Sequence, residues 1–251
     1  MKFWVGSNSV TVNVPDWRSL ESAISDRYSA GKGFVLATLN MDHLAKLQND
    51  KGMQFAYGGQ DLVVADGNPI VWMSELANHP VSLMPGSDMV EPLAQYCADN
   101  NLSIALVGST PESLRGAARS LEQSVPGIDI VRRVSPAFGF DPKGEDAQAI
   151  LQDIADSGAK LCFVALGAPK QEVFATFGRE IAPGVGFACV GAGLDFLAGS
   201  QTRAPVWVRK MSMEWLWRLG TNPQRLGARY LRCIGILPGH LMRSAVRDQT
   251  R

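Results

Sequence analysis

The chain has 251 residues, equal numbers of acidic and basic side chains and 46% hydrophobic residues, a composition that excludes an intrinsically disordered protein. This length fits one large domain, or one domain with an appendage. Its four cysteines and three histidines show no ligand spacing, so we expect no structural zinc site and interpret the cysteines as buried thiols.

Apolar runs rich in Val, Ile and Leu predict seven strands. They lie at residues 34–38, 62–65, 81–84, 103–107, 128–131, 161–166 and 186–190. Helical patterns separate them at residues 16–30, 41–49, 69–77, 89–99, 111–123, 145–157 and 171–181. This alternation predicts an α/β fold, a doubly wound and mostly parallel sheet of Rossmann-like type whose strands are buried on both faces. Ligands of such sheets bind beyond the carboxyl ends of the strands, so polar residues that follow a strand are candidate site residues.

Asp66 is the first such candidate. In the stretch QDLVVADGNPIVW, the apolar run 62–65 stops at Asp66, and a turn leads to Pro69 and a helical pattern. Two explanations fit a carboxylate at this place. Asp66 either caps the helix that begins near Pro69, or it is held at the rim of the sheet because it acts there as a chemical group.

Two further strand ends carry polar pairs. Thr38 and Asn40 end one strand and precede a helix, where they either bind a sugar or nucleotide or cap that helix. In VALGAPKQEVF, Lys170 and Gln171 open a helix after a tight turn. Lys170 is suited to neutralise a phosphate and Gln171 to hydrogen-bond a ligand, although an ordinary capped turn explains the same pattern.

Two glycine-containing turns give weaker signals. LVGSTPESL has free amides at a helix start that could receive a phosphate, as many strand–turn–helix junctions do. GVGFACVGAGLDFLAG supplies two glycines of a dinucleotide fingerprint, but Phe196 occupies the third position, which disfavours a nicotinamide dehydrogenase. We expect Asp195 to cap or brace this second turn instead.

The end of the chain differs in charge from the rest. Residues 1–200 hold 14 basic and 22 acidic side chains, whereas residues 201–251 hold 10 and 2. We therefore predict a core over residues 1–200 and a basic amphipathic helical appendage over residues 201–251, with Pro238 ending its second helix. Such a helix pair suits an anionic membrane surface, and a helical hairpin packed on the core with a solvated basic face is the alternative.

Taken together, these stretches resemble the WecG/TagA/CpsF family of bacterial glycosyltransferases. The resemblance runs from about residue 38 to residue 230 and rests on TLN, ADGNPIVW, PGSDMV, ALGAPKQE, GVGFACVGAGLDFLAG and RAPVWVRKMSMEWLWRLGTNPQRLGARY. It implies an inverting transferase that moves a sugar of the N-acetylmannosamine or glucose class from a UDP-sugar to a polyprenyl-diphosphate-linked saccharide. The implied setting is surface-polysaccharide or wall-polymer synthesis, on the cytoplasmic face of the plasma membrane.

The resemblance also implies roles for particular residues. Asp66 matches the proposed catalytic base, Thr38 and Asn40 a substrate-pocket pair, and Gln171 a ligand-binding glutamine. Three arginines match an appendage that closes over the site and touches the membrane: Arg218, Arg225 and Arg229. One departure concerns Leu83, where members commonly carry an arginine expected to contact phosphate; Arg203 or Lys170 is the candidate substitute.

Other classes of protein stay open on the sequence. A soluble nucleotide-binding oxidoreductase and a non-catalytic membrane-associated scaffold are the alternatives, and a nucleic-acid binder is disfavoured because the basic residues interleave with Trp and Leu. No D-x-D dipeptide or cluster of metal ligands occurs, so we expect no cofactor and no metal requirement. The absence of a signal peptide and of an 18-residue apolar stretch predicts a cytoplasmic, peripheral membrane protein, with homo-oligomer formation left open.

Overall fold

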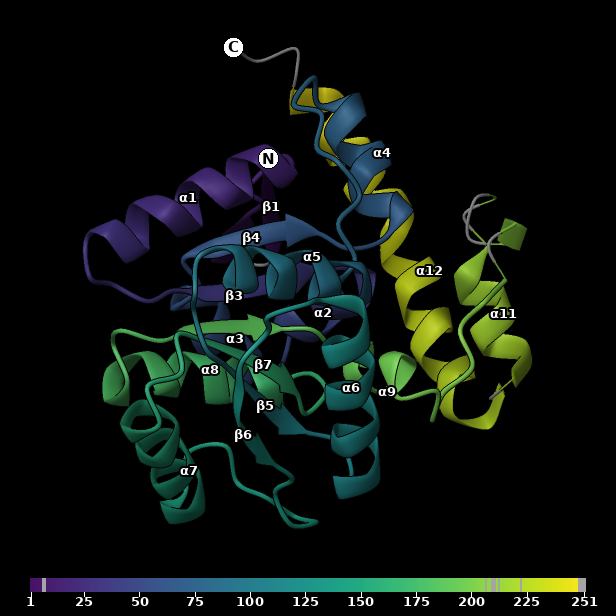
Figure 1. Cartoon of the computed structure of the whole chain (residues 1–251). Coiled ribbons are helices and arrows are strands. Elements are labelled where there is room, and N and C mark those ends of the chain that lie inside the picture. Colours follow the sequence, from purple (N-terminus) through teal and green to yellow (C-terminus); the bar gives the residue numbers. More distant parts are fainter. Residues whose placement is uncertain (6–7, 206, 209–210, 212, 222, 248–251) are drawn as a thin grey trace.

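The computed structural model describes residues 1–5, 8–205, 207–208, 211, 213–221 and 223–247. A six-stranded, all-parallel sheet forms its centre, with strand order β4-β3-β8-β7-β5-β6 (Figure 1). The strands are β3 (Val35–Leu39), β4 (Leu62–Ala65), β5 (Ile104–Gly108), β6 (Ile130–Val134), β7 (Leu161–Ala165) and β8 (Gly186–Cys189). The predicted α/β fold with a parallel sheet is confirmed.

Helices cover both faces of this sheet. One face packs against α1 (Trp17–Ser29), α5 (Gly86–Asp99), α6 (Pro111–Ser124) and α9 (Gly193–Leu197). The opposite face packs against α2 (Met41–Leu47), α3 (Lys51–Gly58), α7 (Glu145–Asp156) and α8 (Lys170–Ile181). Successive strand residues point to opposite faces, so strands buried on both sides need the unbroken apolar runs seen in the sequence.

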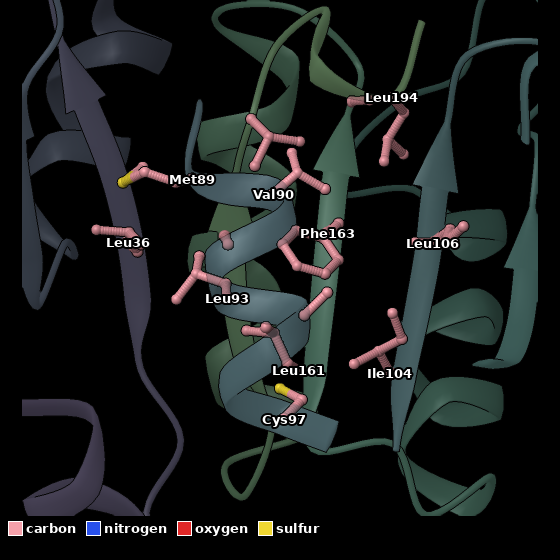
Figure 2. Packing of buried hydrophobic residues seen from close by; sticks show 14 of the residues in the cluster. Leu36, Met89, Val90, Leu93, Cys97, Ile104, Leu106, Leu161, Phe163 and Leu194 are labelled. Carbon is pink, nitrogen blue, oxygen red and sulfur yellow. The ribbon is translucent and has the colours of Figure 1, made fainter. Parts of the chain in front are cut away.

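The face under α5 shows how the core is built. Leu36, Phe163 and Leu106 come from three different strands and belong to one cluster with Met89 and Leu93 of α5, and Leu36 lies beside both α5 residues (Figure 2). All of these side chains are buried. Each fully buried side chain of this size contributes about 1.5–3 kcal/mol to folding, so the cluster fixes α5 firmly on the sheet.

Several parts of the fold differ from the sequence-based expectation, and the helices α3 and α9 were not predicted. Residues 81–84 do not form a full strand, because only Leu83 bridges to Ala65 and the Met84 amide donates to the Ala65 carbonyl. Pro80 and Pro85 flank this segment and lack the N–H groups that a longer ladder needs. An antiparallel pair, β1 (Lys2–Val5) and β2 (Asn8–Thr11), was not predicted.

The C-terminal helices lie on the core beside α4 (Asn68–Leu76). They are α11 (Glu214–Thr221) and α12 (Pro223–Arg247), and α12 runs along α4 and α2 (Figure 1). The prediction that this helix ends at Pro238 is wrong. Leu237 and Leu241 pack against the apolar cluster beneath α12, and His240 and Ser244 are buried, so tertiary packing outweighs the hydrogen bond that the proline removes.

The described helices include none with both the length and the apolar character of a membrane-crossing segment. The division of the chain at residue 200 stays a prediction.

The connections after β3 and after its neighbour β8 turn to opposite faces of the sheet. After β3 the chain turns to α2 and α3 on one face, whereas after β8 it turns to α9 on the other face. Where neighbouring parallel strands send their connections to opposite faces, ligands commonly bind at the carboxyl edge between the loops. The residues that follow β3, and those that follow β4 on its other side, therefore lie where ligands of such sheets bind.

Candidate active site

Three predicted site residues meet at the carboxyl edge of β3 and β4. The register pairs Leu39 of β3 with Ala65 of β4, and the Asp66 amide continues the ladder by donating to the Leu39 carbonyl at 2.8 Å. Asn40 and Asp66 therefore lie at the same level of the sheet edge. Asn40 Nδ2 donates to Asp66 Oδ2 at 3.1 Å, and Thr38 Oγ1 donates more weakly to the same oxygen at 3.5 Å. These contacts hold the partly buried carboxylate in one orientation.

Asp66 is not a helix cap. The helix α4 begins at Asn68, its N-cap is Gly67, and no side chain caps it. Gly67 has a φ of +104°, a conformation that favours glycine, and this turn separates the carboxylate from the helix start. The capping explanation is wrong for Asp66 and correct for Asn40, whose Oδ1 accepts from the His43 amide at 3.0 Å.

Gln171 and Lys170 lie at the start of α8 but have different surroundings. Gln171 is buried, with its Oε1 accepting from the Gly191 amide at 3.1 Å and its Nε2 donating to Glu172 at 2.7 Å. Lys170 is exposed, and its ammonium donates to the Phe140 carbonyl between β6 and α7. Gln171 thus belongs to the carboxyl edge of the sheet near β8, whereas Lys170 contacts the segment that precedes α7.

A buried polar cluster behind these residues was missed by the sequence reasoning. His43 Nδ1 lies 2.7 Å from the Tyr57 hydroxyl, and His43 Nε2 lies 3.8 Å from Glu172 Oε1. Burial lowers the pKa of His43 to about 3, so its ring is neutral and this second contact is not an ion pair. Burial raises the pKa of Glu172 to about 7. The cluster joins the consecutive helices α2 and α3 to the distant α8, and no local pattern marks it.

The appendage reaches this part of the site through Arg229. The Arg229 side chain of α12 lies 3.3 Å from Asp42 of α2, and Asp42 also pairs with Lys46 at 2.8 Å. The side chains of Arg218 and Arg225 lie outside the described part of the structure, so their predicted roles stay predictions. Arg229 therefore holds α12 against the helix that Asn40 caps.

Leu83 and its candidate substitutes occupy different places. Leu83 is exposed and bridges to Ala65, which precedes Asp66. Arg203 pairs instead with Asp88 and lies over the Phe196 ring, beside a cavity of about 600 Å³ between α5 and α9. Lys170 is hydrogen-bonded to the Phe140 carbonyl. Neither side chain makes a described contact with Leu83.

Asp195 was expected to cap or brace the glycine turn before it, but its side chain contacts two loops outside that turn. One carboxylate oxygen accepts from the Ser109 hydroxyl and the other from Gln201 Nε2. Through these bonds Asp195 joins the loop after β5 to the residues that follow α9. Within the part of the chain that the structure describes, no group of three or more His, Cys, Asp or Glu side chains could hold a metal ion.

A parallel α/β sheet with polar side chains gathered at the carboxyl ends of its strands is typical of an enzyme that binds a small ligand there. The family model described as Glycosyl transferase WecG/TagA/CpsF family matches residues 7–251. The chain belongs to this family and is therefore a glycosyltransferase. Membership decides against the oxidoreductase alternative.

The pKa of Glu172 makes a prediction about stability. A buried carboxyl whose pKa rises from 4.5 to about 7 holds its proton more tightly in the folded state, so the wild type loses stability as the pH rises through this range. Glu172→Gln cannot ionise and should lack that loss. Its free energy of unfolding relative to wild type should rise by on the order of 3 kcal/mol between pH 4.5 and 8.

Urea unfolding of both proteins at pH 5 and pH 8 measures this difference. The exposed Glu75→Gln serves as the control and should follow the wild type. Parallel pH dependence of wild type and Glu172→Gln would show that Glu172 is not held protonated by burial.

Proposed function

We propose that this glycosyltransferase moves a hexose of the N-acetylmannosamine or glucose class from a UDP-sugar to a polyprenyl-diphosphate-linked saccharide. The product would enter a surface polysaccharide or wall polymer. The observation that carries the proposal is the carboxylate of Asp66, held at the carboxyl edge of β3 and β4 by the Asn40 amide and the Thr38 hydroxyl. Family membership supplies the reaction class, and this edge of the sheet is the proposed place for the reaction.

Asp66 acts as the general base of this reaction. The acceptor hydroxyl oxygen attacks the anomeric carbon while its proton passes to the Asp66 carboxylate. The bond from the anomeric carbon to the UDP oxygen breaks on the opposite face of the sugar, so the configuration inverts. Asn40 and Thr38 serve as positioning donors, because a base must lie within hydrogen-bonding reach of the proton it takes.

The departing UDP carries negative charge that needs donors or cations. The N-termini of α5 and α8 lack side-chain caps, so their backbone N–H groups are suited to phosphate oxygens. Arg218 and Arg225 of the appendage are the proposed cationic partners. Gln171, Lys170 and Arg229 complete the proposed substrate-binding set.

Replacing the base tests this assignment. Asp66→Asn keeps the shape of the side chain but cannot take a proton, so turnover should fall by about 10²–10⁴-fold. UDP release with a short-chain polyprenyl-diphosphate saccharide as acceptor measures turnover, and thermal unfolding checks that the variant folds. Glu75→Gln, an exposed carboxylate of α4, is the matched control. A folded Asp66→Asn variant with near-normal turnover would show that Asp66 is not the general base.

A lipid-linked acceptor would account for the exposed apolar and basic side chains on the outer surface of α12. Leu231, Ile234 and Met242 are exposed on this helix, at 71%, 56% and 69%. Arg232 and Arg243 are also exposed there. Apolar side chains interleaved with cations are typical of helices that lie on an anionic bilayer. We therefore place the protein peripherally on the inner face of the plasma membrane, with α12 in contact with anionic lipid.

Point substitutions test this contact without uncovering the core that α12 protects. The triple variant Leu231→Ser, Ile234→Ser, Met242→Ser should reduce binding to phosphatidylglycerol vesicles by roughly tenfold or more, because apolar area no longer leaves water. Vesicle flotation measures bound protein. Phe138→Ser, at a fully exposed site beyond the opposite sheet edge, is the control. Unchanged flotation of the triple variant would exclude α12 as the anchor.

A further inference from the structure

Glu172 is a buried acid for which the proposed reaction has no use. Its side chain has no exposed surface, and Oε2 accepts no hydrogen bond from the described residues. A buried carboxyl group costs stability, and replacing such groups by apolar residues of similar volume is often neutral or stabilising. Packing alone therefore does not account for an acid at this position, beside a residue of the candidate site.

The hydrogen bonds of the neighbouring Gln171 side-chain amide indicate the role of Glu172. Gln171 Oε1 accepts from the Gly191 amide, and Gln171 Nε2 donates to Glu172 Oε1. A backbone N–H can only donate, so Gly191 selects the orientation in which Gln171 Oε1 faces it, and the Glu172 oxygen then accepts from Nε2. Rotating the amide by 180° would place N–H against N–H at Gly191 and would take the Glu172 acceptor away from Nε2.

This orientation leaves a donor at the edge of the sheet. A primary amide has two N–H groups, and Glu172 takes one of them. Gln171 lies in the first turn of α8, whose N-terminus has no side-chain cap. Its side-chain oxygen accepts a hydrogen bond from the amide of Gly191, which follows β8. The second N–H and the α8 N-terminus are therefore both donors at the carboxyl edges of β7 and β8, where an anionic group of a ligand is favoured.

We propose that Glu172 is a positioning residue that fixes the Gln171 amide so that its second N–H donates to the diphosphate of the sugar donor. This inference rests on the proposed use of a UDP-sugar. Glu172 itself touches no substrate. The remaining polar contacts of the cluster, from Glu172 to His43 and from His43 to Tyr57, hold the acid in place from α2 and α3.

The test compares UDP binding by the full-length protein and three variants, measured by isothermal titration calorimetry. Glu172→Leu removes the acceptor for the Gln171 N–H and should weaken UDP binding at least fivefold while its melting temperature stays equal to wild type or rises. Glu172→Gln retains an acceptor oxygen and should bind within twofold of wild type. Glu172→Met replaces the leucine variant if the latter yields no folded protein.

Thr176→Val is the matched control for loss of buried polar contacts. Thr176 lies one turn further along α8, and its hydroxyl bonds the carbonyls of Ala56 and Glu172 without touching Gln171. This variant should lose stability and keep its affinity for UDP. Wild-type affinity in Glu172→Leu, or equal weakening in Thr176→Val, would overturn the positioning role alone. No UDP binding by the wild type would overturn the proposed donor, and this inference with it.

Discussion

The carboxyl edge of β3 and β4 is the constraint on which the site depends. The connections after β3 and after its neighbour β8 turn to opposite faces of the sheet, and Asn40 and Asp66 emerge beside this point at one level. Gly67 then turns the chain with a positive φ, which keeps the carboxylate apart from the start of α4. An acid can lie at this edge without capping a helix because the backbone geometry, and not the side chain, makes the turn.

Two sets of contacts hold this edge of the sheet in place, and each joins distant parts of the chain. Behind it, the buried cluster of His43, Tyr57 and Glu172 connects α2, α3 and α8, and through Gln171 it reaches the end of β8. Beside it, α12 packs along α2 and α4 and is paired to Asp42 through Arg229. The same α2 that Asn40 caps thus takes part in both sets of contacts. The helix α12, which we propose lies on the membrane, is consequently in contact with α2, the helix that begins at the Asn40 cap.

The sequence predicted features that are written in short local patterns. Apolar runs that end in a polar residue placed Thr38, Asn40 and Asp66 at one sheet edge, because parallel strands share their carboxyl ends. The prediction failed where contacts between residues distant in sequence determine the structure. The burial of Leu241 and His240 carries α12 past Pro238, and the meeting of His43 with Glu172 depends on helices separated by more than 120 residues. Residues 81–84 are apolar enough for a strand, but their flanking prolines limit them to one bridge.

A crystal structure of the full-length protein with bound UDP tests the central claim most directly. The account predicts that UDP lies at the carboxyl edge of β3, β4 and β8, with Asp66 lining the same pocket as the diphosphate. The cavity between α5 and α9, lined by Asp88 and Arg203, offers the clearest alternative location. UDP bound there, with Asp66 covered by protein and out of reach of the ligand, would contradict the account.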